Sequence, residues 1–421
     1  MQTKRPILGR SCLAGVVLLA TTLAGCGNVP AKDPAGQASQ QPTSGSSSAA
    51  SQPSGSTSSE APAEPVKLTA SVDKGAKGVK VDTIVSVKAE SGTVSRVKLW
   101  TKGTDKEGES KTVKVPGTLS ADGTSWTASS ALDPGSKYRL EMEGKNADNQ
   151  TVKAKSSFTT KKLSLERQTY AKIQPDKGSK VGVGMPVFLT FDVPVKDREE
   201  FQKHLSVTST GNQPGTWSWV NSKTVHYRPK TYWKAGTKVS VRANLNGVRA
   251  GNGIYGQNSV STSFTVGDSV ITKVNLKSKK AKVYINGKLA RTIPISAGKS
   301  GWESRSGTKL ISQKLRMTRM TNEAIGASEE YDFQVPYAMR VTDSGEFLHA
   351  APWKEGKGQF GVRNTSHGCV GMSTANAKWL FGKLKLGAPV ITTGSKRELE
   401  QGNGWSQWDV SYKEFQEGSA L

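Results

Sequence analysis

Short runs in which apolar and polar residues alternate make up most of the chain after residue 65. In the first part of this region they cover 66–72, 79–87, 94–100, 138–142 and 152–158, with turn-forming residues between them. A period of two places the apolar side chains on one face of an extended segment, which is typical of half-buried β-strands. With 44 Gly and 18 Pro in 421 residues, the sequence predicts a mainly β protein of several domains.

Two successive groups of such runs have the spacing of a β-sandwich. In the first, over 66–160, residues 132–138 (LDPGSKY) resemble the tyrosine-corner turn of immunoglobulin-like sandwiches. The second, over 161–267, repeats the plan with strands at 187–191, 216–220, 224–227 and 238–241 and a short helix at 197–205. We interpret both groups as immunoglobulin-like domains. His204 and His226 alternate with core positions there, so we interpret them as surface or structural residues.

A third β-rich domain is predicted over 268–394. Asn286-Gly287 is a strong hairpin signal between two alternating runs, and Ser373 is a typical N-cap for a helix over 374–384. The expected strands cover 269–276, 282–285, 288–295, 337–341, 347–349 and 388–393. The segment 317–331, rich in Met, Thr, Asn, Glu and Gly, is predicted to be mobile. The tail, 395–421, holds Trp405 and Trp408, which we expect to dock back onto the fold.

The N-terminus has the features of an export signal. Lys4, Arg5 and Arg10 precede a short apolar stretch at 13–23, and the following Ala24-Gly25-Cys26 completes a sequence that resembles a bacterial lipoprotein box. We therefore expect residues 1–25 to be a signal peptide and Cys26 to carry lipid, such as palmitate; an uncleaved anchor is the alternative. Residues 26–65, rich in Ser, Gly and Pro, are predicted to be a disordered tether with a span on the order of 35 Å.

The chain is strongly basic, with 59 Lys+Arg against 34 Asp+Glu and a net charge of +25. The basic residues are scattered, with no basic helix and no zinc-finger spacing, so we expect no nucleic-acid partner. An anionic membrane or wall surface fits this charge better. A solvated basic surface with no specific partner is the alternative.

Cysteine usage indicates a reactive thiol. Of the three cysteines, Cys12 lies in the signal, Cys26 is the lipid acceptor, and Cys369 is left without a disulfide partner. It follows Gly368, and His349 lies 20 residues upstream. An imidazole within reach generates a thiolate, and a glycine lets backbone N–H groups turn toward an oxyanion. This chemistry is acyl transfer through a thioester; a buried, inert cysteine is the alternative.

Two motifs carry a family resemblance. His349-Ala350-Ala351-Pro352-Trp353 and Ser366-His367-Gly368-Cys369 resemble the catalytic motif of the L,D-transpeptidases, the YkuD-type enzymes that cross-link bacterial peptidoglycan. The resemblance covers about 268–394. The layout upstream is similar to that of the lipid-anchored actinobacterial members with two immunoglobulin-like domains. It implies a location on the extracytoplasmic face of the cell membrane, extending into the wall.

The resemblance implies a role for each matching position. Cys369 is the expected nucleophile and His349 the base. The backbone carbonyl of Ala350, a position at which the family commonly has serine, orients the imidazole. Gly368, Cys369 and His367 are expected to stabilise the oxyanion. The expected substrate-binding residues are Met317, Tyr331 as a lid, Trp353 and Ser366. His367 has an alternative role in holding its loop, and Trp353 in core packing. No cofactor is expected, and the motif offers only three metal ligands without metal-binding spacing.

The implied activity is the formation of 3→3 cross-links between a donor tetrapeptide stem and an acceptor stem. The resemblance also implies inactivation by carbapenems. Two alternatives remain open on the sequence: an L,D-carboxypeptidase that hydrolyses the same acyl-enzyme, and a non-catalytic wall-binding lipoprotein.

Overall fold

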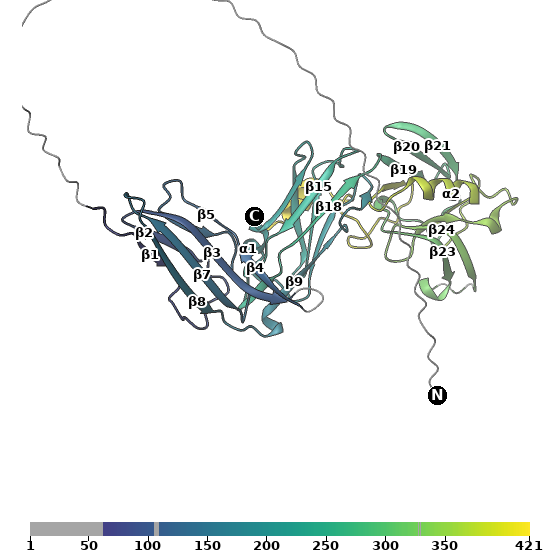
Figure 1. Cartoon of the computed structure of the whole chain (residues 1–421). Coiled ribbons are helices and arrows are strands. Elements are labelled where there is room, and N and C mark those ends of the chain that lie inside the picture. The colour runs from purple at the N-terminus through teal and green to yellow at the C-terminus, as the bar shows by residue number, and fades with distance from the viewer. Residues whose placement is uncertain (1–61, 105–108, 327, 329) are drawn as a thin grey trace, which may run out of the picture. The chain divides into compact units, whose positions relative to one another are not determined.

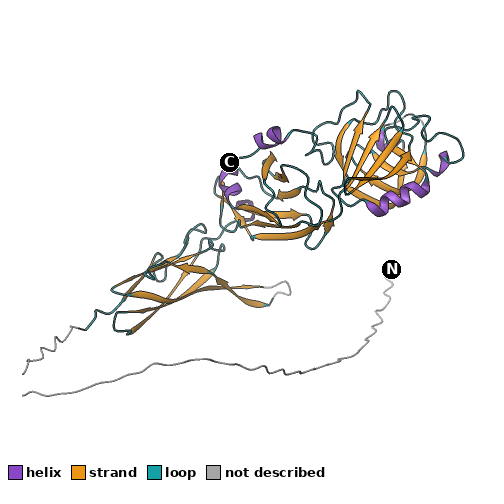
Figure 2. Cartoon of the chain, turned by 90° about the horizontal axis from the view of Figure 1, so that it is seen from above, coloured by secondary structure: helices purple, strands orange, loops and turns teal. Residues whose placement is uncertain are grey.

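The computed structural model describes residues 62–421 except 105–108, 327 and 329. Strands dominate it and its helices are short (Figure 2), so the expectation of a mainly β protein is confirmed. The predicted signal peptide, Cys26 and most of the tether lie outside the described residues. Within these ranges, no helix has both the length and the apolar character that a membrane crossing requires.

Residues 67–159 form two four-stranded sheets (Figure 1). One has the order β1 (Lys67–Ala70), β2 (Ser86–Glu90), β6 (Ser125–Ala128), β5 (Gly117–Leu119), and the other β4 (Ser110–Val115), β3 (Thr93–Thr104), β7 (Lys137–Lys145), β8 (Thr151–Thr159). The core between them includes Leu99, Trp126 and Leu140. The Tyr138 hydroxyl accepts a hydrogen bond from the Asp133 N–H at 2.8 Å, which is the bond expected of a tyrosine corner.

The strand predicted over 79–87 is wrong in most of its length, because β2 begins only at Ser86. Val81 and Val85 are buried outside any strand: Val81 lies in a turn in which the Thr83 N–H donates to the Lys80 carbonyl, and Val85 joins the core just before β2. Buried residues two or four positions apart therefore need not lie on a strand.

Residues 168–266 form a second pair of sheets. Helix α1 (Arg198–Lys203) is capped by Asp197, whose carboxylate accepts from the Glu200 N–H. The four-stranded sheet has the order β10 (Lys180–Val181), β18 (Val260–Val266), β15 (Lys238–Ala243), β12 (Leu205–Ser209). The six-stranded sheet has the order β13 (Gly215–Asn221), β14 (Thr224–Pro229), β11 (Val187–Phe191), β9 (Gln168–Gln174), β17 (Ile254–Gln257), β16 (Arg249–Gly251). The predicted strands and helix of this region are confirmed.

The tail packs on this second pair of sheets, as expected from its tryptophans. The Trp408 indole N–H donates to the Gly184 carbonyl at 2.7 Å, and Trp405 lies 4.9 Å from Phe188 between ring centres. His226 packs edge-on against Phe188 and has a ring nitrogen 3.0 Å from Gln407 of the tail. These contacts give His226 a structural role. The chain then ends with helix α3 (Tyr412–Glu417).

Two further sheets, built from residues 270–393, hold the predicted catalytic motifs. One has the order β21 (Lys288–Pro294), β20 (Lys280–Ile285), β19 (Val270–Asn275), β27 (Pro389–Thr393), β22 (Gly307–Leu310). The other has the order β23 (Gln313–Thr321), β24 (Asp332–Arg340), β25 (Phe347–Ala350), β26 (Val370–Met372). Helix α2 (Thr374–Lys383), capped by Ser373, packs against β24 and β25. The hairpin turn at Asn286-Gly287 is confirmed, with φ of 48° and 82°.

No strand was predicted within 317–331, but the first part of this segment forms one. Residues 317–321 belong to β23, which pairs with β24 along its whole length. None of the nine residues of β23 is buried. Without a buried face, a strand shows no alternation of apolar and polar residues, and the sequence signal is lost.

Candidate active site

Two parallel strands bring the two motifs together. His349 lies on β25, and Cys369 immediately precedes β26. The two strands pair in parallel with His349 opposite Gly371. Two motifs 20 residues apart in sequence therefore meet at one end of a strand pair, and both side chains line a single pocket of about 600 Å³.

Most of the predicted substrate-binding residues also line this pocket. Tyr331, Trp353 and Ser366 do so, and His367, which was predicted to help stabilise the oxyanion, lines the pocket as well, together with residues 318–321 of β23. Met317 does not, and its side chain is 54% exposed. Met317 pairs with Pro336, and the part of β23 that lines the pocket begins at the next residue, Thr318.

The imidazole of His349 has a defined orientation. Its Nδ1 lies 2.7 Å from the carbonyl oxygen of Ala350, which can only accept a hydrogen bond, so Nδ1 carries the proton and Nε2 is left as a base. The orienting bond expected from the resemblance is therefore present, with alanine in place of serine. Burial lowers the pKa of His349 to about 4, and the ring is neutral at pH 7.

The thiol of Cys369 is also neutral in the resting protein. It lies 3.4 Å from the Gly345 carbonyl, to which it donates. Burial raises the pKa of Cys369 to about 12, against the opposing effects of the Phe347 N–H and the Lys354 charge. The pair is therefore a thiol and a neutral imidazole that line the same pocket. Such a thiol becomes reactive when the base removes its proton during attack on a carbonyl.

This protonation state predicts how alkylation of Cys369 depends on pH. Because only the thiolate reacts, the rate with iodoacetamide should keep rising from pH 7 to pH 10, close to tenfold per unit. A small free thiol has a pKa of about 8.5 and levels off above it. The measurement is the alkylation rate at Cys369 by peptide mapping, with N-acetylcysteine as the reference. A rate that is flat between pH 6 and pH 8 would instead show a preformed thiolate–imidazolium pair.

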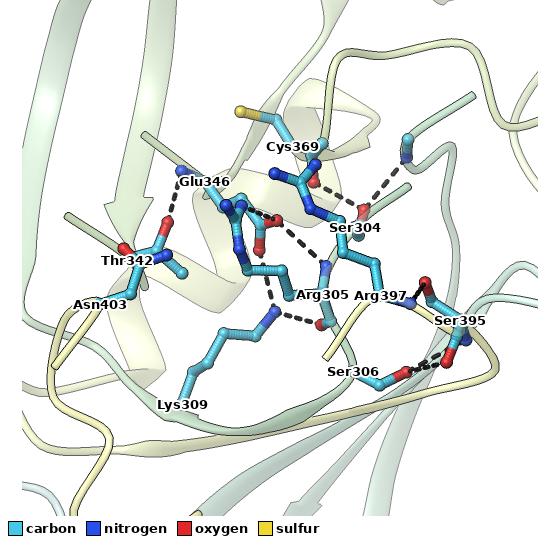
Figure 3. Close-up of polar contacts among 12 residues, drawn as sticks. Ser304, Arg305, Ser306, Lys309, Thr342, Glu346, Cys369, Ser395, Arg397 and Asn403 are labelled. Carbon is cyan, nitrogen blue, oxygen red and sulfur yellow. Dashed lines mark hydrogen bonds and ion pairs between the residues drawn. The ribbon is translucent and has the colours of Figure 1, made fainter. Parts of the chain in front are cut away.

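The loop before Cys369 is held by three serine hydrogen bonds. Gly368 has a φ of +121°, which favours glycine. The Ser366 hydroxyl donates to the Cys369 carbonyl at 2.6 Å and accepts from the Gly368 N–H at 3.3 Å. The Ser304 hydroxyl donates to the Gly368 carbonyl at 2.6 Å (Figure 3). Since a trans peptide is planar, fixing this carbonyl directs the Cys369 N–H to the opposite side. Ser304 has no motif around it and was not predicted.

A buried ion cluster lies behind this loop. The carboxylate of Glu346 is 3.0 Å from both the Arg305 guanidinium and the Lys309 ammonium, as Figure 3 shows. It also accepts from the Arg305 N–H at 3.0 Å. The backbone N–H of Glu346 donates to the hydroxyl of Thr342. All three charged side chains are buried. Because Glu346 immediately precedes β25, the cluster fixes the start of the strand that carries His349.

Stacked rings surround the mouth of the site. The His367 ring stacks on the Tyr331 ring, with 5.4 Å between the ring centres, and makes an edge-on contact with Trp302, with 5.0 Å between the ring centres. The Trp353 ring stacks on the rings of Phe333 and His349, with 4.4 Å and 5.9 Å between the respective ring centres. These contacts favour a structural role for His367 and place Trp353 against the expected base. Phe333 and Trp302 were missed by the sequence reasoning; the i, i+2 spacing of Tyr331 and Phe333 is the signal that could have indicated the first.

No metal centre is evident in the part of the chain that the structure describes. No three His, Cys, Asp or Glu side chains come together there as a metal site requires. The arrangement instead suits nucleophilic acyl transfer: one thiol, one oriented neutral base, and backbone N–H groups beside the nucleophile.

Comparisons with known proteins identify the family. A model described as the L,D-transpeptidase catalytic domain matches residues 269–392, and one described as a bacterial Ig domain matches residues 76–249. L,D-transpeptidase 2 of Mycobacterium tuberculosis is 32% identical over 364 residues, covering 84% of this chain and 85% of that protein. L,D-transpeptidase 5 of the same species is 30% identical over 316 residues, covering 73% of this chain and 68% of that protein. A solved L,D-transpeptidase in complex with imipenem is 32% identical, covers 53% of this chain and 98% of its own, and has a TM-score of 0.46. On the catalytic-domain match and the identity over most of both chains, this protein belongs to the L,D-transpeptidase family.

Proposed function

We propose that this L,D-transpeptidase uses Cys369 as its nucleophile and forms 3→3 cross-links between peptidoglycan stem peptides. The observation that supports this most directly is the orientation of His349. Its Nδ1 bond to Ala350 leaves Nε2 unprotonated in the same pocket as the thiol. A base in that state can accept the thiol proton at neutral pH.

The proposed first half-reaction makes a thioester. His349 Nε2 takes the proton from Cys369 as the sulfur attacks the carbonyl carbon of the third residue of a donor tetrapeptide, a diaminopimelate or similar residue. The Cys369 N–H stabilises the oxyanion. The imidazolium then gives its proton to the amine of the terminal D-alanine, the C–N bond breaks, and D-alanine leaves.

The proposed second half-reaction transfers the acyl group. The side-chain amine of an acceptor stem attacks the thioester, His349 takes a proton from that amine, and the C–S bond breaks. The sulfur leaves as a thiolate and recovers the proton from His349. A new amide bond joins the two stems, and the resting thiol is restored.

The decisive experiment is incubation of the purified protein with a disaccharide-tetrapeptide, followed by mass analysis. A cross-linked dimer together with free D-alanine is the expected product. Tripeptide without dimer would show an L,D-carboxypeptidase, in which water resolves the same acyl-enzyme. An unchanged substrate, in a protein that also forms no adduct with a carbapenem, would favour the wall-binding lipoprotein.

Membership of the family also supports inactivation by carbapenems. The thiolate of Cys369 would attack the β-lactam carbonyl, the ring C–N bond would open, and the opened drug would stay attached as a thioester. The intact mass should then increase by the mass of one drug molecule.

We further propose that residues 1–25 direct export, that Cys26 carries lipid, and that 26–65 tether the protein. The immunoglobulin-like domains at 66–160 and 161–267 would then be spacers that carry the catalytic domain, 268–394, from the outer face of the membrane into the wall. The support is the motif at 23–26 and the composition of the tether. Detergent partitioning tests this, because Cys26→Ser should move the protein from the detergent phase to the aqueous phase.

A further inference from the structure

Lys354 places a buried positive charge in the catalytic pocket. It ends a 3₁₀ turn, Pro352–Lys354, that follows directly on the strand carrying His349. The side chain lines the pocket, although the residue is only 8% exposed. Its ammonium donates to the hydroxyl of Thr365 at 2.7 Å and to that of Ser296 at 3.3 Å. The cation is thus held by two neutral oxygens at the wall of the site.

Among the described residues, no carboxylate lies within ion-pair distance of Lys354. The other two cations of the pocket are differently placed. Arg319 forms a two-bond ion pair with Asp332. Arg340 is half-buried; its guanidinium donates to the Gln313 side chain and to two backbone carbonyls and lies over the Phe347 ring. Lys354 is therefore the pocket cation that is both buried and bonded only to hydroxyls.

A buried cation without an anion is energetically unfavourable. Removing an ammonium from water costs several kcal/mol unless an opposite charge compensates, and burial accordingly lowers the pKa of Lys354 to about 8. An ammonium has three N–H donors, and the two hydroxyls occupy two of them. One donor and one uncompensated charge remain at the wall that faces the nucleophile and the base.

We propose that Lys354 binds a carboxylate of the acyl donor and thereby determines donor specificity. This assignment rests on the proposed function. A donor tetrapeptide carries two carboxylates near the bond that breaks: the terminal one, on the leaving D-residue, and the one on the side chain of the third residue. Either anion would complete the ion pair, and Thr365, immediately before the Ser366–Cys369 motif, keeps the ammonium in register with the nucleophile.

The test compares three donors on the wild-type protein: the free tetrapeptide, its C-terminal amide, and the tetrapeptide amidated on the third side chain. One of the two amides should react about 10–100-fold more slowly than the free acid in kcat/KM, because a hydrogen bond to a charged partner is lost. The amide that reacts slowly identifies which carboxylate is bound. This comparison does not depend on any variant folding.

Variants then assign the effect to Lys354. Lys354→Met should lower kcat/KM for the free acid by about 10–100-fold, mainly through KM, and should leave the rate with the slow amide unchanged. Lys354→Arg, which keeps the charge, should restore the preference for the acid. The matched control is Lys357→Met, which removes the same charge from an exposed lysine three residues along the chain and should change nothing.

The outcomes separate this assignment from the proposed function. A wild-type protein that uses all three donors equally well would overturn the role of Lys354 while leaving the cysteine mechanism intact. An equal loss with every donor in Lys354→Met would likewise show that Lys354 is only a structural residue. A wild-type protein that consumes none of the three donors would contradict the proposed function itself.

Discussion

Substitution of Cys369 by alanine is expected to abolish cross-link formation while leaving the fold intact. The described residues contain no other cysteine, and neighbouring serines cannot replace it, because Ser366 already donates to the Cys369 carbonyl. Removing a catalytic nucleophile lowers kcat on the order of 10⁴-fold or more. The measurements are dimer formation from a disaccharide-tetrapeptide and the intact mass after exposure to a carbapenem. Neither dimer nor adduct should be detected.

The control for this variant is a histidine far from the site in sequence. His204, half-buried and 3.4 Å from Glu200 in the second pair of sheets, does not line the pocket, and His204→Gln should retain full activity. Thermal unfolding of Cys369→Ala should match the wild type within a few degrees, since the thiol makes a single weak bond to Gly345. Dimer formation by folded Cys369→Ala would rule out the thioester mechanism.

Substitution of Glu346 by glutamine should strongly destabilise the catalytic domain. The change keeps the size of the side chain but removes the carboxylate that the buried Arg305 and Lys309 share. Arg305 keeps its pair with Glu400, and the Lys309 ammonium is left without an ion pair among the described residues. Removing one partner of a buried ion pair lowers the free energy of unfolding by about 3–5 kcal/mol. For a domain of this size, this corresponds to a decrease in Tm of roughly 10–20 °C. The measurement is the unfolding transition of the catalytic domain by calorimetry.

Two further variants make this prediction specific. Asp332→Asn breaks the exposed pair with Arg319 and should change stability by less than about 1 kcal/mol, because water screens that pair. Adding Lys309→Met to Glu346→Gln removes the ammonium that Glu346→Gln leaves without an ion pair, whereas Arg305 keeps its pair with Glu400 at 2.6 Å, so the double variant should recover part of the lost stability. A Tm for Glu346→Gln within about 2 °C of the wild type would show that the cluster does not stabilise the domain.

The sequence was sufficient where the signal lies in neighbouring residues. The hairpin at Asn286-Gly287, the Ser373 cap and the tyrosine corner at Tyr138 depend on local backbone geometry, so each could be predicted and each is present. The meeting of His349 and Cys369 was inferred from a motif, and the parallel pairing of β25 and β26 supplies its physical reason.

Alternation of apolar and polar residues predicted strands wrongly in two situations: where buried apolar residues lie outside a strand, and where a strand has no buried face. Val81 and Val85 are buried on a segment that is not a strand, so their spacing imitated one. The strand β23 has no buried face, so no strand was predicted there, and Met317 was placed in a pocket whose lining on β23 begins only at Thr318.

What the sequence alone determined is therefore the mainly β fold and the pair of side chains suited to acyl transfer. Only the tertiary structure decided that this pair is neutral at rest, that Ser304 fixes the nucleophile loop, and that Lys354 faces the pocket with no carboxylate beside it. Strand periodicity and motif spacing are properties of adjacent residues. Protonation and charge pairing depend instead on burial and on partners distant in sequence, such as Glu346 with Arg305 and Lys309, which only folding brings together.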